Sequence, residues 1–248
     1  MTDEDRTTSV SEIQVLSMLR HPNIIAYYDS FIAKEGLEQK GSLHGTLMIV
    51  MEYADAGTLD DFIKLQKKSL PEEEILNMFS QICLGLHHVH SQNTLHRDLK
   101  TSNILISGTG RSKVLKIGDF GISKVMTNSV AKSLVGTPSY LSPELCEGKP
   151  YDDKSDIWAL GCILYEMTML RKIFEGTNLP SLVLKIMKGV YDPIPAHYSQ
   201  DLRELIGWMC RLDPEKRPQM RDLVATSQLQ QHLIEAQISI GRVDSMWS

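Results

Sequence analysis

One polar stretch, residues 96–103, lies between two apolar segments and limits how the 248-residue chain can fold. Its sequence is His-Arg-Asp-Leu-Lys-Thr-Ser-Asn. Before it, a long helix is predicted to start at Pro71, with a buried face formed by Ile75, Phe79, Ile82, Leu86 and Val89. After it, the short apolar runs 104–106 and 114–117 are typical of a small hairpin. The stretch is therefore expected to be a short connection from a helix into a hairpin.

The rest of the chain predicts few strands and many helices. Apolar spacing predicts a helix over residues 9–19, and β-forming residues predict strands over 24–32 and 46–53. Beyond residue 141 the expected helices are 154–169, 179–187, 202–212 and 220–227. We therefore expect an α+β fold in three parts: a small region of one helix and two strands (1–53), a mainly helical body (54–227), and a C-terminal extension or tail (228–248).

Composition excludes several classes of protein. The formal net charge of −5 offers no basic patch for nucleic acid. No apolar run approaches the ~20 residues that a membrane-spanning helix needs, so we expect no membrane partner. The cysteines lack the spacing of a metal site and are expected to be buried thiols in a reducing, cytoplasmic compartment: Cys83, Cys146, Cys162 and Cys210.

A cluster of histidines near the end of the long predicted helix offers an alternative metal site. It consists of His87, His88 and His90. Adjacent histidines on a helix point in different directions, so ligation by this cluster is disfavoured.

The residue types in the polar stretch suit phosphoryl transfer from Mg-ATP to a hydroxyl group. Asp98 can orient and deprotonate the hydroxyl, and Lys100 can place its ammonium group against the moving phosphate. Asn103, and Asp119 of the Asp-Phe-Gly motif at 119–121, supply the hard oxygen ligands that Mg²⁺ prefers. A lone His-Arg-Asp would be weak evidence, but these elements in this order make a strong signal.

At these residues the chain resembles the eukaryotic protein kinases. The resemblance continues in Gly-Thr-Pro at 136–138 and Ser-Pro-Glu at 142–144, which are similar to the segment that closes the activation loop and docks substrate. It implies that Asp156, in Asp-Ile-Trp-Ala-Leu-Gly, braces the catalytic loop and that Arg217 pairs with Glu144. The implied fold is protein-kinase-like, with a mainly helical C-lobe and an incomplete N-lobe.

A narrower resemblance is to the NIMA-related (Nek) serine/threonine kinases and covers roughly residues 9–227. It is carried by Leu-Arg-His-Pro-Asn-Ile-Ile at 19–25, Gly-Asp-Phe-Gly-Ile-Ser-Lys at 118–124 and Leu-Cys-Glu-Gly-Lys-Pro-Tyr at 145–151. The resemblance implies protein substrates with serine or threonine hydroxyls. As a family it also suggests partners and a location at microtubules, centrosomes or cilia.

The resemblance also assigns roles around the nucleotide. Met51 would be the gatekeeper of the adenine pocket, the hinge would be Glu52, Tyr53 and Ala54, and Leu105 would be the pocket floor, with Gly118 beside the nucleotide. Glu12 would pair with the lysine that grips the phosphates, and Thr137 would hydrogen-bond near Asp98 and Lys100. Ser133 is the expected phosphorylation site, where a phosphate could pair with Arg97; an exposed, unmodified serine is the alternative.

Part of the nucleotide grip of such a kinase is missing from the sequence. No glycine occurs before Gly36 and no lysine before Lys34, so the glycine-rich loop, its strands and the phosphate-gripping lysine are not supplied. The strand at 46–53 is then expected to expose backbone groups. The sequence favours a truncated, poorly active kinase; the alternatives are a non-catalytic interaction module and a weakly active enzyme that uses another cation.

Overall fold

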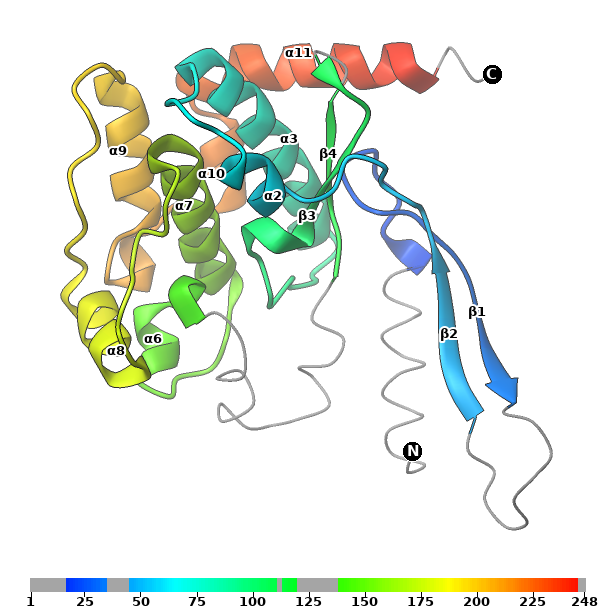
Figure 1. Cartoon of the computed structure of the whole chain (residues 1–248), viewed down its shortest axis with the longest axis horizontal. Helices are drawn as coiled ribbons and strands as arrows, with labels where there is room; N and C mark the ends of the chain where they lie inside the picture. The colour runs from blue at the N-terminus through cyan, green and yellow to red at the C-terminus, as the bar shows by residue number, and fades with distance from the viewer. Residues whose placement is uncertain (1–16, 35–44, 111–112, 120–137, 245–248) are drawn as a thin grey trace.

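The computed structural model describes residues 17–34, 45–110, 113–119 and 138–244. Its strands are β1 (Tyr27–Lys34), β2 (Gly45–Met51), β3 (Ile104–Ser107) and β4 (Val114–Ile117). Its helices are α2 (Leu59–Lys64), α3 (Glu72–Ser91), α6 (Pro143–Cys146), α7 (Asp153–Met169), α8 (Leu179–Lys188), α9 (Gln200–Met209), α10 (Met220–Val224) and α11 (Ser227–Asp244). The helices gather into one body, from which β1 and β2 extend (Figure 1). This arrangement agrees with the expected α+β kinase fold.

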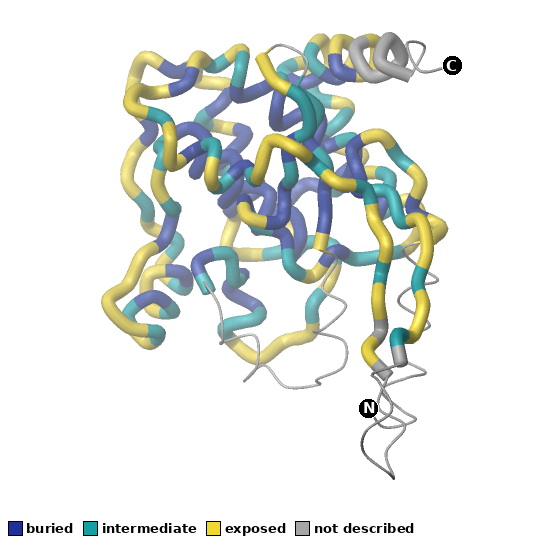
Figure 2. Tube along the Cα trace, turned by 45° about the vertical axis from the view of Figure 1, so that its right-hand side comes forward, coloured by how far each residue is buried: buried dark blue, intermediate teal, exposed yellow. Residues whose placement is uncertain are grey.

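Helix α7 forms the centre of the helical body. All residues from 155 to 168 are buried, and α7 packs against both α3 and α9. Figure 2 shows the buried residues gathered in the interior of the helical body. A helix that is buried on all sides is stable only when other elements surround it. The body is therefore organised around a helix that begins close to the predicted brace, Asp156.

Most predicted helices are confirmed, with shifted ends. The long helix begins at Glu72 and not at Pro71, because Pro71 has extended backbone angles (φ −59°, ψ 140°) and forms the N-cap. The helix expected over 202–212 runs from Gln200 to Met209 as α9. Of the helix expected over residues 9–19, the structure describes only residues 17–19, where Ser17 and Met18 are helical.

The C-terminal region holds a packed helix. The helix predicted over 220–227 ends at Val224, and α11 then runs as a separate helix along α3. Leu229, Leu233 and Ala236 are buried. Their spacing places them on one helical face, so this face anchors α11 to the body.

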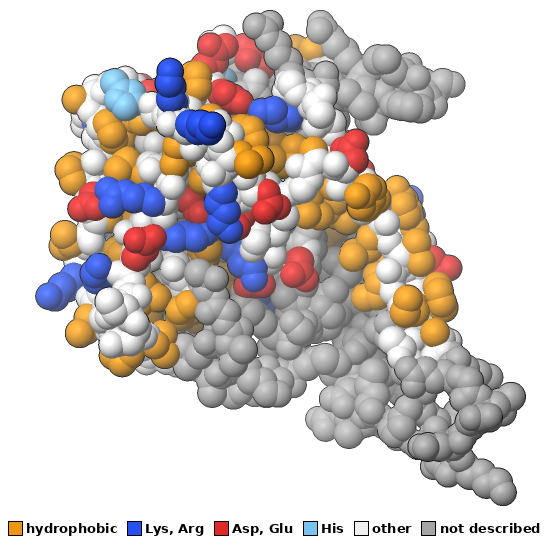
Figure 3. All heavy atoms as spheres, viewed as in Figure 1, with side chains coloured by type: hydrophobic (Ala, Val, Ile, Leu, Met, Phe, Trp, Pro, Cys, Tyr) orange, Lys and Arg blue, Asp and Glu red, His pale blue; other side chains and the backbone are white. Residues whose placement is uncertain are grey.

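The two N-terminal strands form an antiparallel hairpin with apolar side chains on its surface. Tyr27 pairs with Met51 at one end and Lys34 with Gly45 at the other, and no third strand joins them within the described residues. Apolar side chains gather over this hairpin in Figure 3, and Phe31, Ile32 and Met48 are exposed.

The strand predicted over 24–32 begins later than expected because its first residues pair elsewhere. The Ile25 N–H donates to the Ile117 carbonyl at 2.9 Å, and the Ile117 N–H donates to the Asn23 carbonyl at 2.8 Å. The Asn23 side chain also donates to the Leu115 carbonyl at 2.9 Å and to Gln81 Oε1 at 3.3 Å. The chain before β1 is thereby attached to β4 and α3.

The chain after β2 is attached to the same small sheet. The Ala56 N–H donates to the Ile106 carbonyl at 3.0 Å, and the Ile106 N–H donates to the Gly57 carbonyl at 2.9 Å. Strand β3 pairs in turn with β4, from Ile104–Ile117 to Ser107–Val114, which confirms the predicted hairpin. Both ends of the β1–β2 region are therefore joined to β3–β4.

None of the helices in the described ranges combines the length and the apolar character that crossing a bilayer requires. All four cysteines are free thiols; Cys83, Cys162 and Cys210 are buried and Cys146 is half-buried. Burial raises the pKa of the Cys146 thiol to about 11, with the carboxylates of Glu144 and Glu147 adding to the shift. Burial also raises the pKa of the Cys83 and Cys162 thiols, so these three thiols stay protonated at neutral pH, as expected for structural cysteines.

Candidate active site

The connection between α3 and β3 brings three of the predicted catalytic residues together. Lys100 Nζ donates to Asp98 Oδ2 at 2.9 Å. Asn103 Nδ2 donates to the same oxygen at 3.1 Å and to the Asp98 carbonyl at 2.8 Å. The Asp98 carboxylate is thus held between a cation and an amide, with 17% of the side chain exposed. It is oriented and still accessible to an incoming group.

The buried carboxylate of Asp156 holds the start of this connection. Its Oδ2 accepts from the His96 N–H at 3.0 Å and lies 2.9 Å from His90 Nε2. Its Oδ1 accepts from the Arg97 N–H at 3.2 Å and from the Tyr151 hydroxyl. Arg97 has φ 67°, a left-handed conformation that is unfavourable for a residue with a Cβ. Asp156 therefore fixes a strained turn, as the resemblance implied.

The ionisation of Asp156 follows from these contacts. Burial alone would raise the pKa of its carboxyl group, but the hydrogen bond and charge of His90, together with His96 and the Tyr151 hydroxyl, lower the pKa overall. Burial and the Asp156 charge raise the pKa of Tyr151. The pair is therefore a carboxylate that accepts a hydrogen bond from a neutral phenol.

His96 connects the catalytic loop to the residue before Asp119. The ring is fully buried, and burial lowers its pKa. Its Nδ1 accepts from the Asp98 N–H at 3.2 Å, so in the neutral ring Nε2 carries the proton and donates to the Gly118 carbonyl, 3.1 Å away. The Gly118 N–H donates to the Asn103 carbonyl at 2.9 Å. Two hydrogen bonds thus place the Asp119 backbone beside Asn103.

Gly118 and Leu105 lie against each other. A Cβ on Gly118 would be 3.1 Å from Leu105 Cδ1 and 3.3 Å from Ile25 Cγ1. The absence of a side chain therefore permits close approach of these apolar groups. The next residue, Asp119, is exposed and has φ 50°. Its carboxylate is carried on a turn at the end of β4.

The predicted hinge follows β2. Its residues are Glu52, Tyr53 and Ala54, and the predicted gatekeeper, Met51, is the last residue of β2. Met51 and Tyr53 are 47% and 85% exposed. Glu52 instead joins its neighbours: its Oε1 is 2.9 Å from Lys116 Nζ, and its Oε2 accepts from the Ala26 N–H at 3.2 Å. This ion pair ties the hinge to β4.

The predicted pair of Glu144 and Arg217 is present in the structure. Arg217 donates from Nη1 and Nη2 to the two carboxylate oxygens, at 2.7 Å each, and both residues are buried. Ser155 at the start of α7 donates to Glu144 Oε1 at 2.8 Å. The segment at 138–146 is thereby anchored to α7 and to the chain before α10.

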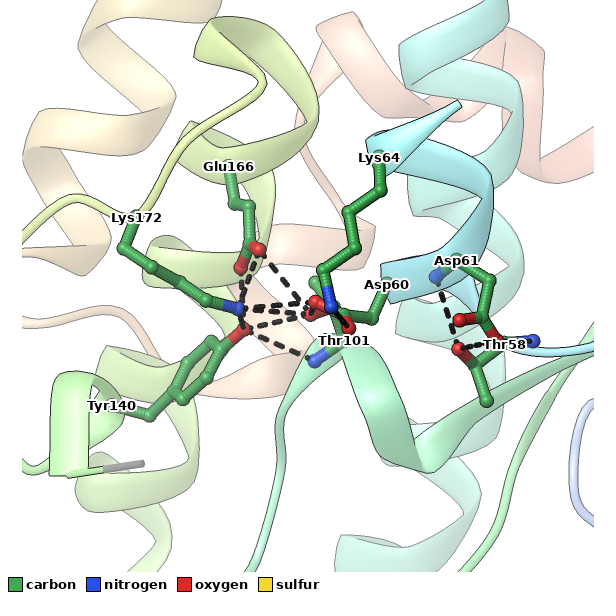
Figure 4. Close-up of polar contacts among 8 residues, drawn as sticks. All are labelled: Thr58, Asp60, Asp61, Lys64, Thr101, Tyr140, Glu166 and Lys172. Atoms are coloured by element: carbon green, nitrogen blue, oxygen red, sulfur yellow. Dashed lines mark hydrogen bonds and ion pairs between the residues drawn. The ribbon is translucent and has the colours of Figure 1, made fainter. Parts of the chain in front are cut away.

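A second polar cluster was not predicted from the sequence. It joins Asp60, Thr101, Tyr140, Glu166 and Lys172 and lies between α2, the catalytic loop and α7 (Figure 4). These residues come from distant parts of the chain and follow no motif spacing. The only sequence signal was that Thr101 lies inside the catalytic stretch.

Three predicted site residues lie outside the described part of the chain: Glu12, Ser133 and Thr137. Within the described part, no group of three or more histidine, cysteine or acidic side chains is arranged to hold a metal ion. His90 contacts Asp156, while His88 stacks on His21 with ring centroids 5.2 Å apart. The alternative metal site at His87, His88 and His90 is therefore not formed.

Comparison with known proteins gives the family. Residues 1–229 match the protein kinase domain family. The serine/threonine-protein kinase Nek8 of Danio rerio is 51% identical over 245 residues, which cover 98% of this chain and 33% of that protein. The probable serine/threonine-protein kinase nek3 of Dictyostelium discoideum is 50% identical over 239 residues, or 94% of this chain and 20% of that protein.

A third relative is similar over most of its own length. The serine/threonine-protein kinase nekl-2 of Caenorhabditis elegans is 40% identical over 253 residues, covering 98% of this chain and 68% of that protein. The chain thus spans a third or less of the first two relatives and about two thirds of the third. The motifs, the fold and these similarities agree, and the chain belongs to the protein kinase family, in its NIMA-related (Nek) serine/threonine branch.

Proposed function

We propose that the protein transfers the γ-phosphate of ATP to serine and threonine hydroxyls of other proteins. The contact that most supports this is Asp98 Oδ2 held at 2.9 Å from Lys100 Nζ and 3.1 Å from Asn103 Nδ2. In this position Asp98 would accept the proton of the substrate hydroxyl, and Lys100 would face the negative charge that develops on the phosphate.

Asn103 and Asp119 would be the metal ligands. The Asn103 amide nitrogen donates to Asp98, which leaves the amide oxygen as the atom that would bind Mg²⁺. Mg²⁺ supplies neutralisation of the phosphate charge when it is bound with ATP. Met51, the hinge, Leu105 and Gly118 would surround the adenine, since Leu105 and Gly118 already lie in contact.

The proposed reaction is tested by phosphate transfer to peptide libraries. Labelled ATP should give phosphoserine and phosphothreonine, and Asp98→Asn should abolish transfer because it removes the proton acceptor. Asp201→Asn, at an exposed position in the first turn of α9, is the matched control and should leave the rate unchanged. Measurable transfer by Asp98→Asn at the same rate as by the unchanged protein would contradict the proposal.

We expect a polypeptide of only these 248 residues to be poorly active. It contains no glycine before Gly36 and no lysine before Lys34 with which to cover and grip ATP phosphates. Thermal-shift titration with Mg-ATP should then give little stabilisation, since a ligand stabilises a protein only as its concentration exceeds its Kd. A large shift, or ordinary kinase rates that Asp98→Asn abolishes, would contradict this expectation.

Regulation and partners are proposed from the family. Ser133 would be phosphorylated and its phosphate would pair with Arg97, which Asp156 holds in place. Mass spectrometry of active protein that always showed unmodified Ser133 would remove this proposal. Substrates would be proteins of microtubules, centrosomes or cilia in the cytoplasm. Co-localisation of a tagged protein with a centrosome marker tests that location.

A further inference from the structure

A tight turn at the end of α7 brings Lys172 back beside the last turn of the helix. Leu170 caps α7 in a left-handed conformation (φ 56°), and its N–H donates to the Glu166 carbonyl at 2.8 Å. Two residues later, the Lys172 side chain is 23% exposed and points to the cluster drawn in Figure 4. The helix end therefore determines where this ammonium group lies.

The Lys172 ammonium group contacts four different parts of the fold. Its Nζ lies 2.7 Å from the Tyr140 hydroxyl and 2.5 Å from Glu166 Oε1. It also lies 3.3 Å from Thr101 Oγ1 and 3.5 Å from Asp60 Oδ1. The contacts thus join α7 to α2, to the catalytic loop and to the turn η3 (Pro138–Tyr140).

The Tyr140 hydroxyl is the second centre of the cluster. It donates to Glu166 Oε2 and accepts from Lys172. It also lies 2.8 Å from Thr101 Oγ1 and accepts from the Thr101 N–H at 3.3 Å. Burial and the Glu166 charge raise the pKa of Tyr140, so the phenol stays neutral and can donate. The turn η3 is therefore bonded directly to the catalytic loop.

Charge explains why a lysine is needed at this place. The Glu166 side chain is only 3% exposed, and a buried carboxylate without a cation is strongly unfavourable. Asp60 has a second cation, Lys64 at 2.5 Å, whose side chain is 71% exposed. In the part of the chain that the structure describes, Lys172 is the cation in contact with Glu166. Losing Lys172 would therefore leave the Glu166 charge uncompensated, whereas losing Lys64 would not.

We infer that Lys172 is a positioning residue. Through Tyr140 and Thr101 it holds η3, and the segment that leads from η3 into α6, at a set distance from the catalytic loop. Because η3 belongs to the segment whose motifs at 136–138 and 142–144 resemble the substrate-docking part of a kinase, this distance governs how a protein substrate would meet Asp98. The inference about substrate rests on the proposed function, but the positioning itself does not.

Hydrogen–deuterium exchange tests the positioning without any need for catalysis. Lys172→Met should make amides in peptides covering residues 99–103 and 138–142 exchange about tenfold faster, because local opening becomes easier. Lys172→Arg should restore most of the protection. Lys64→Met is the matched control: it also removes a cation from Asp60 but not from Tyr140, and exchange should stay unchanged.

If Lys172→Met does not fold, Tyr140→Phe replaces it, since it removes only the hydroxyl and keeps the ion pair of Lys172 and Glu166. Faster exchange confined to the two segments supports the inference. Unchanged exchange, or the same change in Lys64→Met, overturns it.

Peptide kinetics separate positioning from simple destabilisation. In protein that phosphorylates peptides, Lys172→Met should raise the KM for the peptide about tenfold and leave the KM for ATP unchanged. Equal changes in the KM for the peptide and the KM for ATP would overturn the link to substrate. The exchange experiment alone would then decide whether Lys172 positions η3. A protein with no transferase activity would remove the proposed function, and the exchange result would still stand.

Discussion

Arg217 binds both carboxylate oxygens of Glu144, at 2.7 Å each, inside the helical body. Its guanidinium group also lies 5.0 Å from the centre of the Trp158 ring. Burial alone would raise the pKa of Glu144, but the hydrogen bonds and charge of Arg217 lower it overall. Glu144 is therefore held as a carboxylate, and each member of the pair depends on the other.

Replacing Arg217 by methionine should strongly destabilise the protein. The Glu144 carboxylate would stay buried without a cation, which costs about 3–5 kcal/mol. Urea unfolding measures this change. Combining Arg217→Met with Glu144→Leu should recover part of the loss. The exposed pair of Lys149 and Glu147, 2.6 Å apart, gives the control: Lys149→Met should have no measurable effect.

Two glycines on neighbouring helices should respond in opposite directions to alanine. A Cβ on Gly161 in α7 would lie 2.7 Å from Cys210 Sγ and 2.8 Å from Met209 Cβ. Gly161→Ala should therefore cost about 1–3 kcal/mol through overpacking. On Gly207 in α9 the nearest atom would be the Tyr191 hydroxyl at 3.8 Å, so Gly207→Ala should stabilise by about 0.5–1 kcal/mol. Equal shifts in the urea midpoint would contradict this packing of α7 on α9.

Asp156 and Asp152 are close in sequence but should differ in importance. Asp156→Asn replaces one of the two accepting oxygens by an NH₂ donor. The His96 and Arg97 N–H groups then compete for one acceptor, which should lower the free energy of unfolding by about 3 kcal/mol. Asp152 only caps α7, accepting from the Ser155 N–H at 3.1 Å, so Asp152→Ala should cost about 1 kcal/mol. Thermal unfolding of both variants checks the order, and a reversed order would show that Asp156 does not brace the loop.

Stability should fall as the pH drops from 6.5 towards 4, partly because of His21. Burial, with the nearby His88, Lys116 and His87, lowers the pKa of His21 to about 4. As the pH falls below about 6.5, His21 takes up a proton in the unfolded chain but stays neutral in the folded chain down to about pH 4. Acid therefore favours unfolding between pH 6.5 and 4, and His21 has no effect on stability above this range. The Asn23 N–H also donates to His21 Nδ1 at 3.0 Å, and protonation would break this bond.

The His21 contribution is isolated by a matched pair of variants. His21→Gln should flatten the slope of Tm against pH between 6.5 and 4. His197 is exposed and its ring lies at a tilt to that of Tyr198, with centroids 4.2 Å apart, so His197→Gln should leave the slope unchanged. If the slope of Tm against pH is unchanged in His21→Gln, then protonation of His21 does not destabilise the folded protein.

The parts that could be predicted are those with local spacing or a short motif. Apolar periodicity was sufficient for α3 and α8, and the motif resemblance was sufficient for the pairing of Glu144 with Arg217 and for the role of Asp156. In each case the relevant residues follow a recurring pattern.

The unpredicted parts depend on tertiary contacts that no such pattern encodes. Lys172 contacts residues of four separate segments, and its position depends on Leu170 in a left-handed conformation that usually favours glycine. In α11, Leu229 and Leu233 are separated by polar glutamines, so the apolar face is weak in sequence. That face is buried because α3 packs against it, and the position of α3 cannot be predicted from the α11 sequence.

The attachment of both ends of residues 26–55 to one hairpin has a thermodynamic consequence. Ile25 is bonded to Ile117 and Ala56 to Ile106, so the intervening chain is a closed loop whose ends are fixed by β3–β4. The entropy of closing such a loop grows slowly, by about 0.6 kcal/mol for each doubling of its length. Insertions between β1 and β2 should therefore be well tolerated, because β3–β4 holds both ends of this region whatever its length.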